Sequence, residues 1–256
     1  MMKVRTLFTA FAVAVGAALA TAGGAAASPA ADGEVTPYIV GGGNATQVYS
    51  FMVSLQSTSG SHFCGGSLIK ANWVVTAKHC VQGRSASSVR VRVGSTNRSS
   101  GGTVASGAQI VNHPSYDIAL LRLSTNVSQT PIRVSSSSGA TGTATRIIGW
   151  GQTCAPRGCG GAPVTLQELN TSIVADGSCQ GISGAYEICT NNPGGRAGAC
   201  YGDSGGPQIK SVGGTWELIG ATSRAGNSSS TCATGPSIYM DVPAFRSWIT
   251  TYAGAV

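Results

Sequence analysis

The sequence is poor in charged residues, and most of all in acidic residues and histidines. Only 10% of its 256 residues are charged, with 16 Lys and Arg against 9 Asp and Glu, and it has three histidines. A zinc site needs several ligands at a workable spacing, and neither a His-Glu-x-x-His nor a Cys-x-x-Cys pattern occurs. We therefore expect no metal site and no cofactor.

The net charge of +7 is not gathered in one cluster. Arg90 and Arg92 share one face of an expected strand, but the other arginines are scattered, and no run alternates basic with aromatic residues. A basic surface can attract acidic partners such as nucleic acid. The scattered pattern instead favours an ordinary hydrated surface with a positive bias, and we expect no nucleic-acid partner.

A long apolar run occurs only near the N-terminus, from about Leu7 to Ala20 after a short basic start. It is short for a membrane span of ~20 residues, and alanine and glycine dilute it. Because Ala25-Ala26-Ala27 fits a signal-peptidase site, we prefer a signal peptide over residues 1–27 to an uncleaved anchor. Residues 28–38 are expected to form a propeptide. The chain is then secreted, without a membrane partner, and residues 39–256 suffice for one sizeable core.

The rest of the chain consists of short apolar or β-branched runs separated by Gly, Ser, Asn and Pro, as in all-β proteins. Residues 89–93 alternate strictly, which predicts a half-buried antiparallel strand. The strand candidates are 51–55, 73–76, 89–93, 119–123, 146–149, 169–174, 208–212 and 217–222. One helix is expected, over 242–252, where Pro243 lies at the start and apolar residues share one face.

Eight cysteines follow residue 38, and an even number in an exported chain indicates disulfides rather than metal. Spacing alone cannot choose among the possible pairings. They are Cys64, Cys80, Cys154, Cys159, Cys179, Cys189, Cys200 and Cys232.

The segment from Gly202 to Pro207, Gly-Asp-Ser-Gly-Gly-Pro, is the most informative motif. A serine flanked by glycines fits a sharp turn that exposes its hydroxyl and aims the N–H groups of Gly202 and Ser204 at an oxyanion. Ordinary turns use the same residue types, so the weight comes from three further segments. They are Thr76-Ala77-Lys78-His79-Cys80, Asp117-Ile118-Ala119-Leu120-Leu121 and Ile39-Val40-Gly41-Gly42.

These four segments together resemble the trypsin- and chymotrypsin-like serine proteases, of the actinomycete-like bacterial kind, over the whole of residues 39–256. The resemblance implies an all-β fold of two antiparallel six-stranded β-barrels with a C-terminal helix, with a crossing between barrels near 129–144. It implies a secreted, monomeric endopeptidase that takes protein or peptide substrates and is open to protein protease inhibitors.

The resemblance also implies the roles of individual residues. His79 is the general base, Asp117 orients it, and Ser204 is the nucleophile, while Gly202 and Ser204 supply the oxyanion hole. Ser223 matches the serine that helps to hold the aspartate. Cleavage before Ile39 would free an α-ammonium that pairs with Asp203, so the chain would be made as an inactive zymogen.

The disulfide pairing follows from the same resemblance: Cys64–Cys80, Cys179–Cys189 and Cys200–Cys232, which leaves Cys154 and Cys159 to close a small loop.

The sequence departs from the pattern of this family at three places. Lys78 replaces the usual alanine and is expected to reach solvent, the loop before Asp117 looks shortened, and residues 94–107 lack an acid, so a calcium loop is not supported.

The substrate pocket is expected to be neutral, because Gly198 stands where trypsin-like relatives carry Asp. Ala225 and Ser237 stand where relatives with wide pockets have glycines, and their added bulk favours substrates with smaller apolar side chains. Tyr38 precedes the activation cleavage, so an enzyme that activates itself must accept a large side chain in the pocket. We expect a chymotrypsin-like specificity for large apolar or aromatic side chains. An elastase-like specificity is the close alternative, and a trypsin-like specificity is disfavoured.

Two non-enzymatic alternatives stay open at this stage. One is a catalytically inactive relative that binds a partner through the same fold, and the other is a secreted lectin-like or wall-binding β domain. His62 and His113 have no motif around them, and both are interpreted as surface or strand-end residues.

Overall fold

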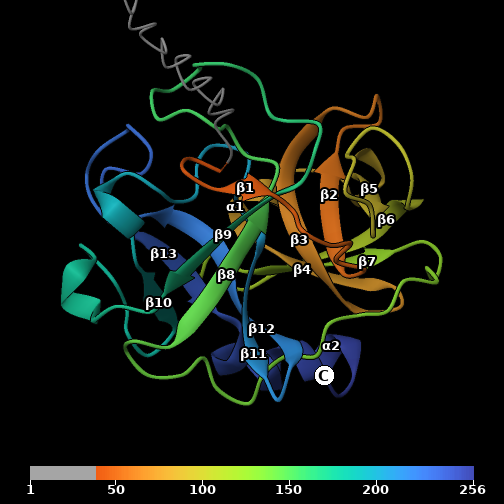
Figure 1. Cartoon of the computed structure of the whole chain (residues 1–256). Coiled ribbons are helices and arrows are strands. Elements are labelled where there is room, and N and C mark those ends of the chain that lie inside the picture. The colour runs from red at the N-terminus through yellow and green to blue at the C-terminus, as the bar shows by residue number, and fades with distance from the viewer. Residues whose placement is uncertain (1–38) are drawn as a thin grey trace, which may run out of the picture. The chain divides into compact units, whose positions relative to one another are not determined.

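Residues 39–256, the part of the chain that this computed structural model describes, are built around two antiparallel sheets (Figure 1). The expected signal peptide, 1–27, and propeptide, 28–38, lie outside the described residues. Among residues 39–256, no helix has the length and apolar character needed to cross a membrane.

The first sheet is a closed barrel of six strands, because its first strand pairs with its last in spatial order. Alternate residues such as Val91 and Val93 point inward and are fully buried, as the alternation predicted. In spatial order the strands are β2 (Met52–Gln56), β3 (His62–Lys70), β4 (Trp73–Thr76), β7 (Ala119–Leu123), β6 (Thr103–Asn112) and β5 (Arg90–Val93).

The second sheet has seven strands. In spatial order they are β1 (Gly43–Asn44), β9 (Gln167–Ser172), β8 (Ala144–Gly149), β11 (Pro207–Val212), β12 (Thr215–Ala225), β13 (Ser237–Asp241) and β10 (Glu187–Thr190). An isolated bridge between Ile173 and Thr190 joins the ends of β9 and β10, so six strands come round as a second barrel. The seventh strand, β1, pairs with the outer edge of β9. The expected chymotrypsin-like fold is confirmed.

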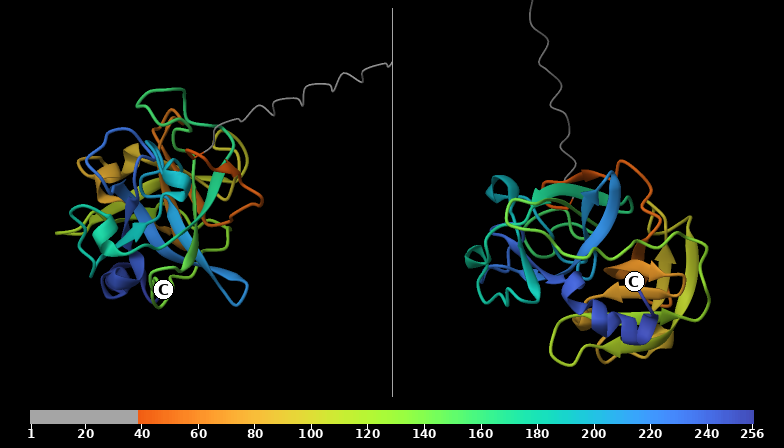
Figure 2. Two further views of the ribbon diagram at one scale, coloured as in Figure 1. Left: turned by 60° about the vertical axis from the view of Figure 1, so that its left-hand side comes forward. Right: turned by 90° about the horizontal axis from the view of Figure 1, so that it is seen from below.

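The C-terminal helix packs against the first barrel (Figure 2, right). A 3₁₀ turn (Val242–Phe245) leads into α2 (Arg246–Ala253), and together they cover the expected range. Phe245 and Ile249 are buried in the same core as the barrel interior. The other helical segments are α1 (Lys78–Val81) and the 3₁₀ turns Ala86–Ser88, Asp176–Ser178 and Pro193–Gly195.

Glycines allow the two barrels to touch beside the nucleophile motif. A Cβ at Gly65, on β3, would lie 2.8 Å from the Cα of Gly206. Gly205 has φ +75°, and its Cβ would overlap the hydroxyl of Thr76, at the end of β4. The N–H of Gly65 donates to the carbonyl of Ser204 at 2.8 Å. The motif therefore lies directly against the segment that carries His79.

All four expected disulfides are present: Cys64–Cys80, Cys154–Cys159, Cys179–Cys189 and Cys200–Cys232. The first of them ties β3 to α1.

Candidate active site

His79 lies in α1, the single helical turn that follows β4. Its backbone N–H donates to Oδ1 of Asp117 at 2.9 Å, and its Nδ1 lies 2.8 Å from Oδ2 of the same carboxylate. The carboxylate accepts, so Nδ1 carries the proton and Nε2 is left free to accept one. The ring is 46% exposed, and a substrate can therefore approach it.

Asp117 comes two residues before β7 and is held from three directions. Besides the two bonds from His79, the hydroxyl of Ser223 donates to Oδ2 at 2.6 Å. Burial alone would raise the pKa of Asp117, but these hydrogen bonds outweigh it and hold the pKa below its ordinary value. The carboxylate is therefore ionised near neutral pH, as a partner for a charged imidazole requires.

Ser204 lines a cavity of about 300 Å³ together with Ser223, Ala225 and Ser237. Gly202 has φ +99°, a conformation that only glycine adopts without strain. Within residues 39–256, neither the N–H of Gly202 nor that of Ser204 donates a hydrogen bond. The two donors expected to form the oxyanion hole are thus free to receive a ligand oxygen.

No acidic residue of the described chain lines the cavity. Gly198 is not itself a lining residue, but a Cβ there would face the hydroxyl of Ser237 at 3.8 Å and Ala233 at 4.0 Å. The one charged residue along the wall is Arg224, whose guanidinium binds the carboxylate of Glu187 at 2.6 Å.

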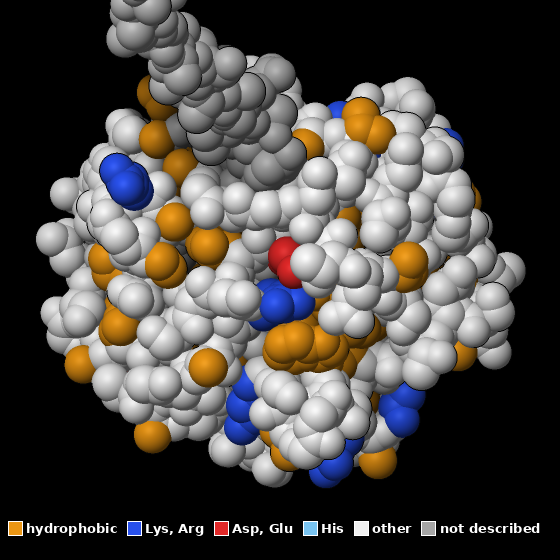
Figure 3. Space-filling model, in the orientation of Figure 1, with side chains coloured by type: hydrophobic (Ala, Val, Ile, Leu, Met, Phe, Trp, Pro, Cys, Tyr) orange, Lys and Arg blue, Asp and Glu red, His pale blue; other side chains and the backbone are white. Residues whose placement is uncertain are grey.

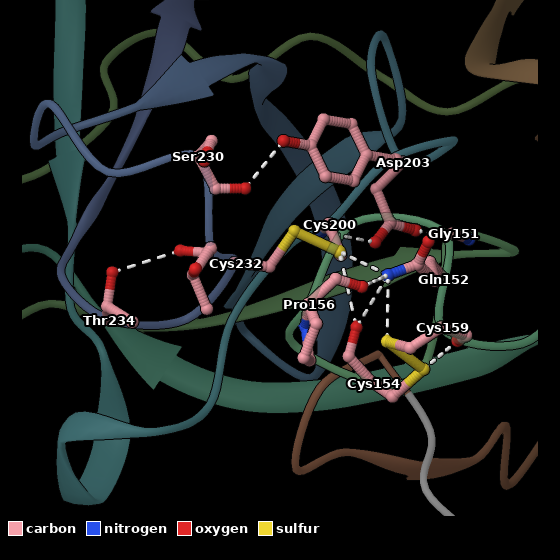
Figure 4. Close-up of a disulfide and its surroundings, with 12 residues drawn as sticks. Gly151, Gln152, Cys154, Pro156, Cys159, Cys200, Asp203, Ser230, Cys232 and Thr234 are labelled. Carbon is pink, nitrogen blue, oxygen red and sulfur yellow. Dashed lines mark hydrogen bonds between the residues drawn. A yellow bond between two sulfur atoms is a disulfide. The ribbon is translucent and has the colours of Figure 1, made fainter.

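One side of the cavity is braced by two disulfides (Figure 4). The side-chain amide of Gln152 donates to the carbonyls of Cys154 and Pro156, at 2.7 and 2.6 Å, inside the small loop closed by Cys154–Cys159. The N–H of Cys232 donates to the carbonyl of Ala155 at 3.0 Å. The small loop is therefore tied to the wall disulfide Cys200–Cys232.

Asp203 and Ile39 are both buried, with exposed fractions of 2% and 1%. The carboxylate of Asp203 accepts from the N–H groups of Gly151 and Cys200, at 2.8 and 2.9 Å. It has no ion-pair partner in the described part of the chain. Burial raises the pKa of Asp203 to about 7, and the two backbone hydrogen bonds offset only part of that effect.

His62 is a site residue that the sequence interpretation missed. It begins β3, as a strand-end residue would, but its ring turns inward against Trp150. Its Nε2 donates to the carbonyl of Gly202 at 3.0 Å, and its Nδ1 accepts from the hydroxyl of Ser54 at 2.8 Å. Burial lowers the pKa of His62 to about 4, so the ring is neutral. No signal near His62 in the sequence points to a partner 140 residues away.

Lys78 also differs from its expected role. Its ammonium does not extend freely into solvent but donates to the carbonyls of His113 and Pro114, at 2.9 and 3.3 Å. Both carbonyls belong to the short loop that leads into Asp117.

Only one grouping of potential metal ligands occurs in the described chain: Cys64, His79 and Cys80. The two cysteines share a disulfide, so neither can supply a thiolate, and the grouping does not fit a zinc site.

Comparisons with known proteins agree with this geometry. The family model described as Trypsin matches residues 39–249. Trypsin alpha of Drosophila erecta is 38% identical over 89% of this chain and 91% of its own length, and trypsin theta of Drosophila melanogaster is 38% identical over 82% and 84%. Trypsin alpha-4 of Lucilia cuprina is 34% identical over the full length of both chains. These relatives are fly proteins and do not support the expected actinomycete-like kind. The chain belongs to the trypsin family of serine proteases and is a serine endopeptidase.

Proposed function

We propose that Ser204, His79 and Asp117 form the catalytic triad of a secreted endopeptidase. His79 Nε2 takes the proton of Ser204, whose oxygen attacks the scissile carbonyl. The N–H groups of Gly202 and Ser204 hold the oxyanion, and His79 then gives its proton to the leaving amine. Water releases the acyl group by the same steps. Asp117, which Ser223 helps to hold, keeps the neutral imidazole in the required tautomer and stabilises the imidazolium that forms.

The observation that carries this proposal is the hydrogen-bonded row Ser223–Asp117–His79 beside a cavity that Ser204 lines. The test is hydrolysis of a diverse peptide library by wild-type protein and Ser204→Ala. The variant should lose on the order of a millionfold in kcat. Ser211→Ala, at an exposed position on β11, is the matched control and should retain full activity. The absence of Ser204-dependent hydrolysis, together with no labelling by a serine-directed phosphonate, would favour a catalytically inactive binding protein.

The primary specificity that we propose is chymotrypsin-like, for large apolar or aromatic side chains, with an elastase-like preference as the alternative. Its support is the neutral cavity, because an arginine or lysine buried there would lack a carboxylate partner. The names of the fly relatives, by contrast, hint at a trypsin-like preference. Cleavage after Phe, Tyr or Leu would support our assignment. Cleavage after Ala or Val would mean that Ala225 and Ser237 set the pocket size, and cleavage after Arg or Lys would contradict a neutral pocket.

We further propose that the chain is a zymogen, with cleavage before Ile39. The new α-ammonium would pair with Asp203, whose buried carboxylate otherwise has only two backbone donors. Tyr239 packs with Ile39 in one apolar cluster and lies within electrostatic reach of Asp203, so the two partners share one region. Ile39→Gly removes the buried side chain and leaves the triad unaltered. It should weaken activity, whereas full activity in that variant would sink the activation scheme.

The partners that we propose are protein or peptide substrates and protein protease inhibitors, with the protein itself a monomer. Basic side chains are spread over the face drawn in Figure 3 and form no continuous patch. Among the arginines, Arg133, Arg146 and Arg224 are each paired with a glutamate. Neither feature favours a nucleic-acid partner.

A further inference from the structure

The loop that carries Asp117 is short, and the side chains of Lys78 and His113 both bond to its backbone. Residues 113–118 connect β6 to β7, and a backbone hydrogen bond from His113 N–H to Ile118 O, at 3.0 Å, closes the loop. The ammonium of Lys78 donates to the carbonyls of His113 and Pro114 in this loop. A cation that accepts no hydrogen bond and donates up to three is suited to hold two such carbonyls.

The ring of His113 also bonds to the loop. Its Nδ1 accepts from the N–H groups of Ser115 and Tyr116, each at 3.2 Å, and it packs edge-on against Phe245 and Trp248. Burial, and then the charge of Lys78, lower the pKa of His113, which favours the neutral ring that these N–H groups need. The loop is thus held both by the Lys78 ammonium and by the His113 ring, which packs on aromatic side chains.

Lys78 and His79 are consecutive residues, and both bond to this one loop. His79 binds the carboxylate of Asp117 through its N–H and its ring, while Lys78 binds the backbone three and four residues earlier. We propose that Lys78 is a positioning residue, which holds the Asp117 loop in register with His79 so that the carboxylate reaches the imidazole. This inference rests on the catalytic role proposed for Asp117 and His79.

The test compares Lys78→Met, which keeps the length of the side chain but lacks the ammonium, with Lys78→Arg, which keeps donors. Lys210→Met, on β11 and away from this loop, is the matched control. Each variant is made as the full chain with a cleavage sequence for an added protease placed before Ile39. Three quantities are measured: kcat and KM on one peptide substrate, the proton NMR resonance of His79 Nδ1–H, and the melting temperature Tm.

The expected result is a loss of kcat in Lys78→Met of about 10- to 100-fold, because a misplacement of about 1 Å has that order of effect, with KM within about twofold. The Nδ1–H resonance should broaden, since a loosened Asp117 protects that proton less well. Lys78→Arg should recover most of the lost kcat, and Lys210→Met should behave as the wild type.

Two results would overturn the proposal. One is a Lys78→Met protein with wild-type kcat and an unchanged resonance. The other is a loss of activity fully explained by a lower Tm, with kcat per folded molecule unaltered. If the wild type itself lacks Ser204-dependent hydrolysis, the catalytic assignment fails, and the resonance still decides whether Lys78 holds the loop.

Discussion

The imidazole of His62 donates from Nε2 to the carbonyl oxygen of Gly202 at 3.0 Å, and the hydroxyl of Ser54 fixes the opposite nitrogen. This contact links the first strands of one barrel to the residue whose N–H is proposed to hold the oxyanion. Because Gly202 has φ +99° and no side chain of its own, external contacts must hold its conformation. His62 supplies one of them.

Replacing His62 with Ala should lower kcat by about 10-fold, less than the ~10²-fold or more seen when an oxyanion donor is itself removed. KM should change little, since the substrate pocket stays intact. Steady-state kinetics on a peptide ester and a peptide amide would measure both. Ser54→Ala, which leaves the bond to Gly202 in place, is the milder partner variant. Equal and unaltered kcat in both would show that Gly202 keeps its conformation without His62.

The stability of the uncleaved chain should fall as pH rises from about 4 to about 7. Asp203 has an ordinary pKa of 3.8 and a folded pKa of about 7. Between these values the unfolded chain has lost the proton that the folded chain keeps, so rising pH favours unfolding. The gap corresponds to about 4 kcal/mol at order of magnitude. Below pH 3.8 both states are protonated, and above pH 7 both are ionised, so the contribution is then constant.

Urea unfolding of uncleaved Ser204→Ala between pH 4 and 8 would measure this effect, and Asp203→Asn in the same background should flatten the curve. After cleavage before Ile39, the ammonium partner should lower the folded pKa and remove most of the slope. A slope that is unchanged by the Asp203→Asn substitution would assign the pH dependence to other groups.

Removal of calcium should not change the stability of the protein. The loop after β5 is organised around a cation that the chain itself supplies: Arg92 donates to the carbonyls of Arg98, Ser99 and Gly101. We expect Tm to be equal in EDTA and in millimolar calcium. Arg92→Met should lower Tm and speed proteolysis within residues 95–102, because three carbonyls lose their donor. Stabilisation of the wild type by calcium would contradict this expectation.

The disulfide Cys154–Cys159 should protect the cavity wall more than it stabilises the whole fold. It closes a small loop, for which chain-entropy arguments give at most about 2 kcal/mol. The double variant Cys154→Ser/Cys159→Ser should therefore lose a few degrees in Tm at most, yet be cut by added protease between residues 153 and 161. Intact-mass analysis over time would follow the cut. The pair Cys179→Ser/Cys189→Ser, in a different loop, is the comparison, and equal resistance at 153–161 in both would refute the local role.

The strands that the sequence predicted well are those whose own residue types indicate burial in the core. Residues 73–76 and 119–123 were predicted at their observed bounds because each is a short segment made mostly of buried apolar residues. β3 escaped detection because Gly65 and Gly66 in its middle resemble a turn. Those glycines are there for a tertiary reason, since a Cβ at either would collide with Gly206 or Val74. Local pattern cannot reveal a constraint imposed by a distant segment.

The candidate site shows the same division. Ser204, His79 and Asp117 could be predicted because each lies in a motif of neighbouring residues. The contacts of Lys78 and His62 could not be predicted, because the residues next to a side chain in sequence do not indicate which distant segment it will contact in the fold. The shortened loop before Asp117 was visible, but not that its shortness brings two carbonyls within reach of the Lys78 ammonium.

The second barrel is complete only through the single bridge between Ile173 and Thr190. Ile173 packs in one cluster with Ile39 and Ile188, so the first described residue is buried at this seam rather than inside a continuous ladder. Because Ile39 is already buried at this seam, the proposed cleavage would free its amino group without a separate step that buries its side chain. The place where the second barrel closes thus shares one apolar cluster with the residue whose new amino group is proposed to switch the enzyme on.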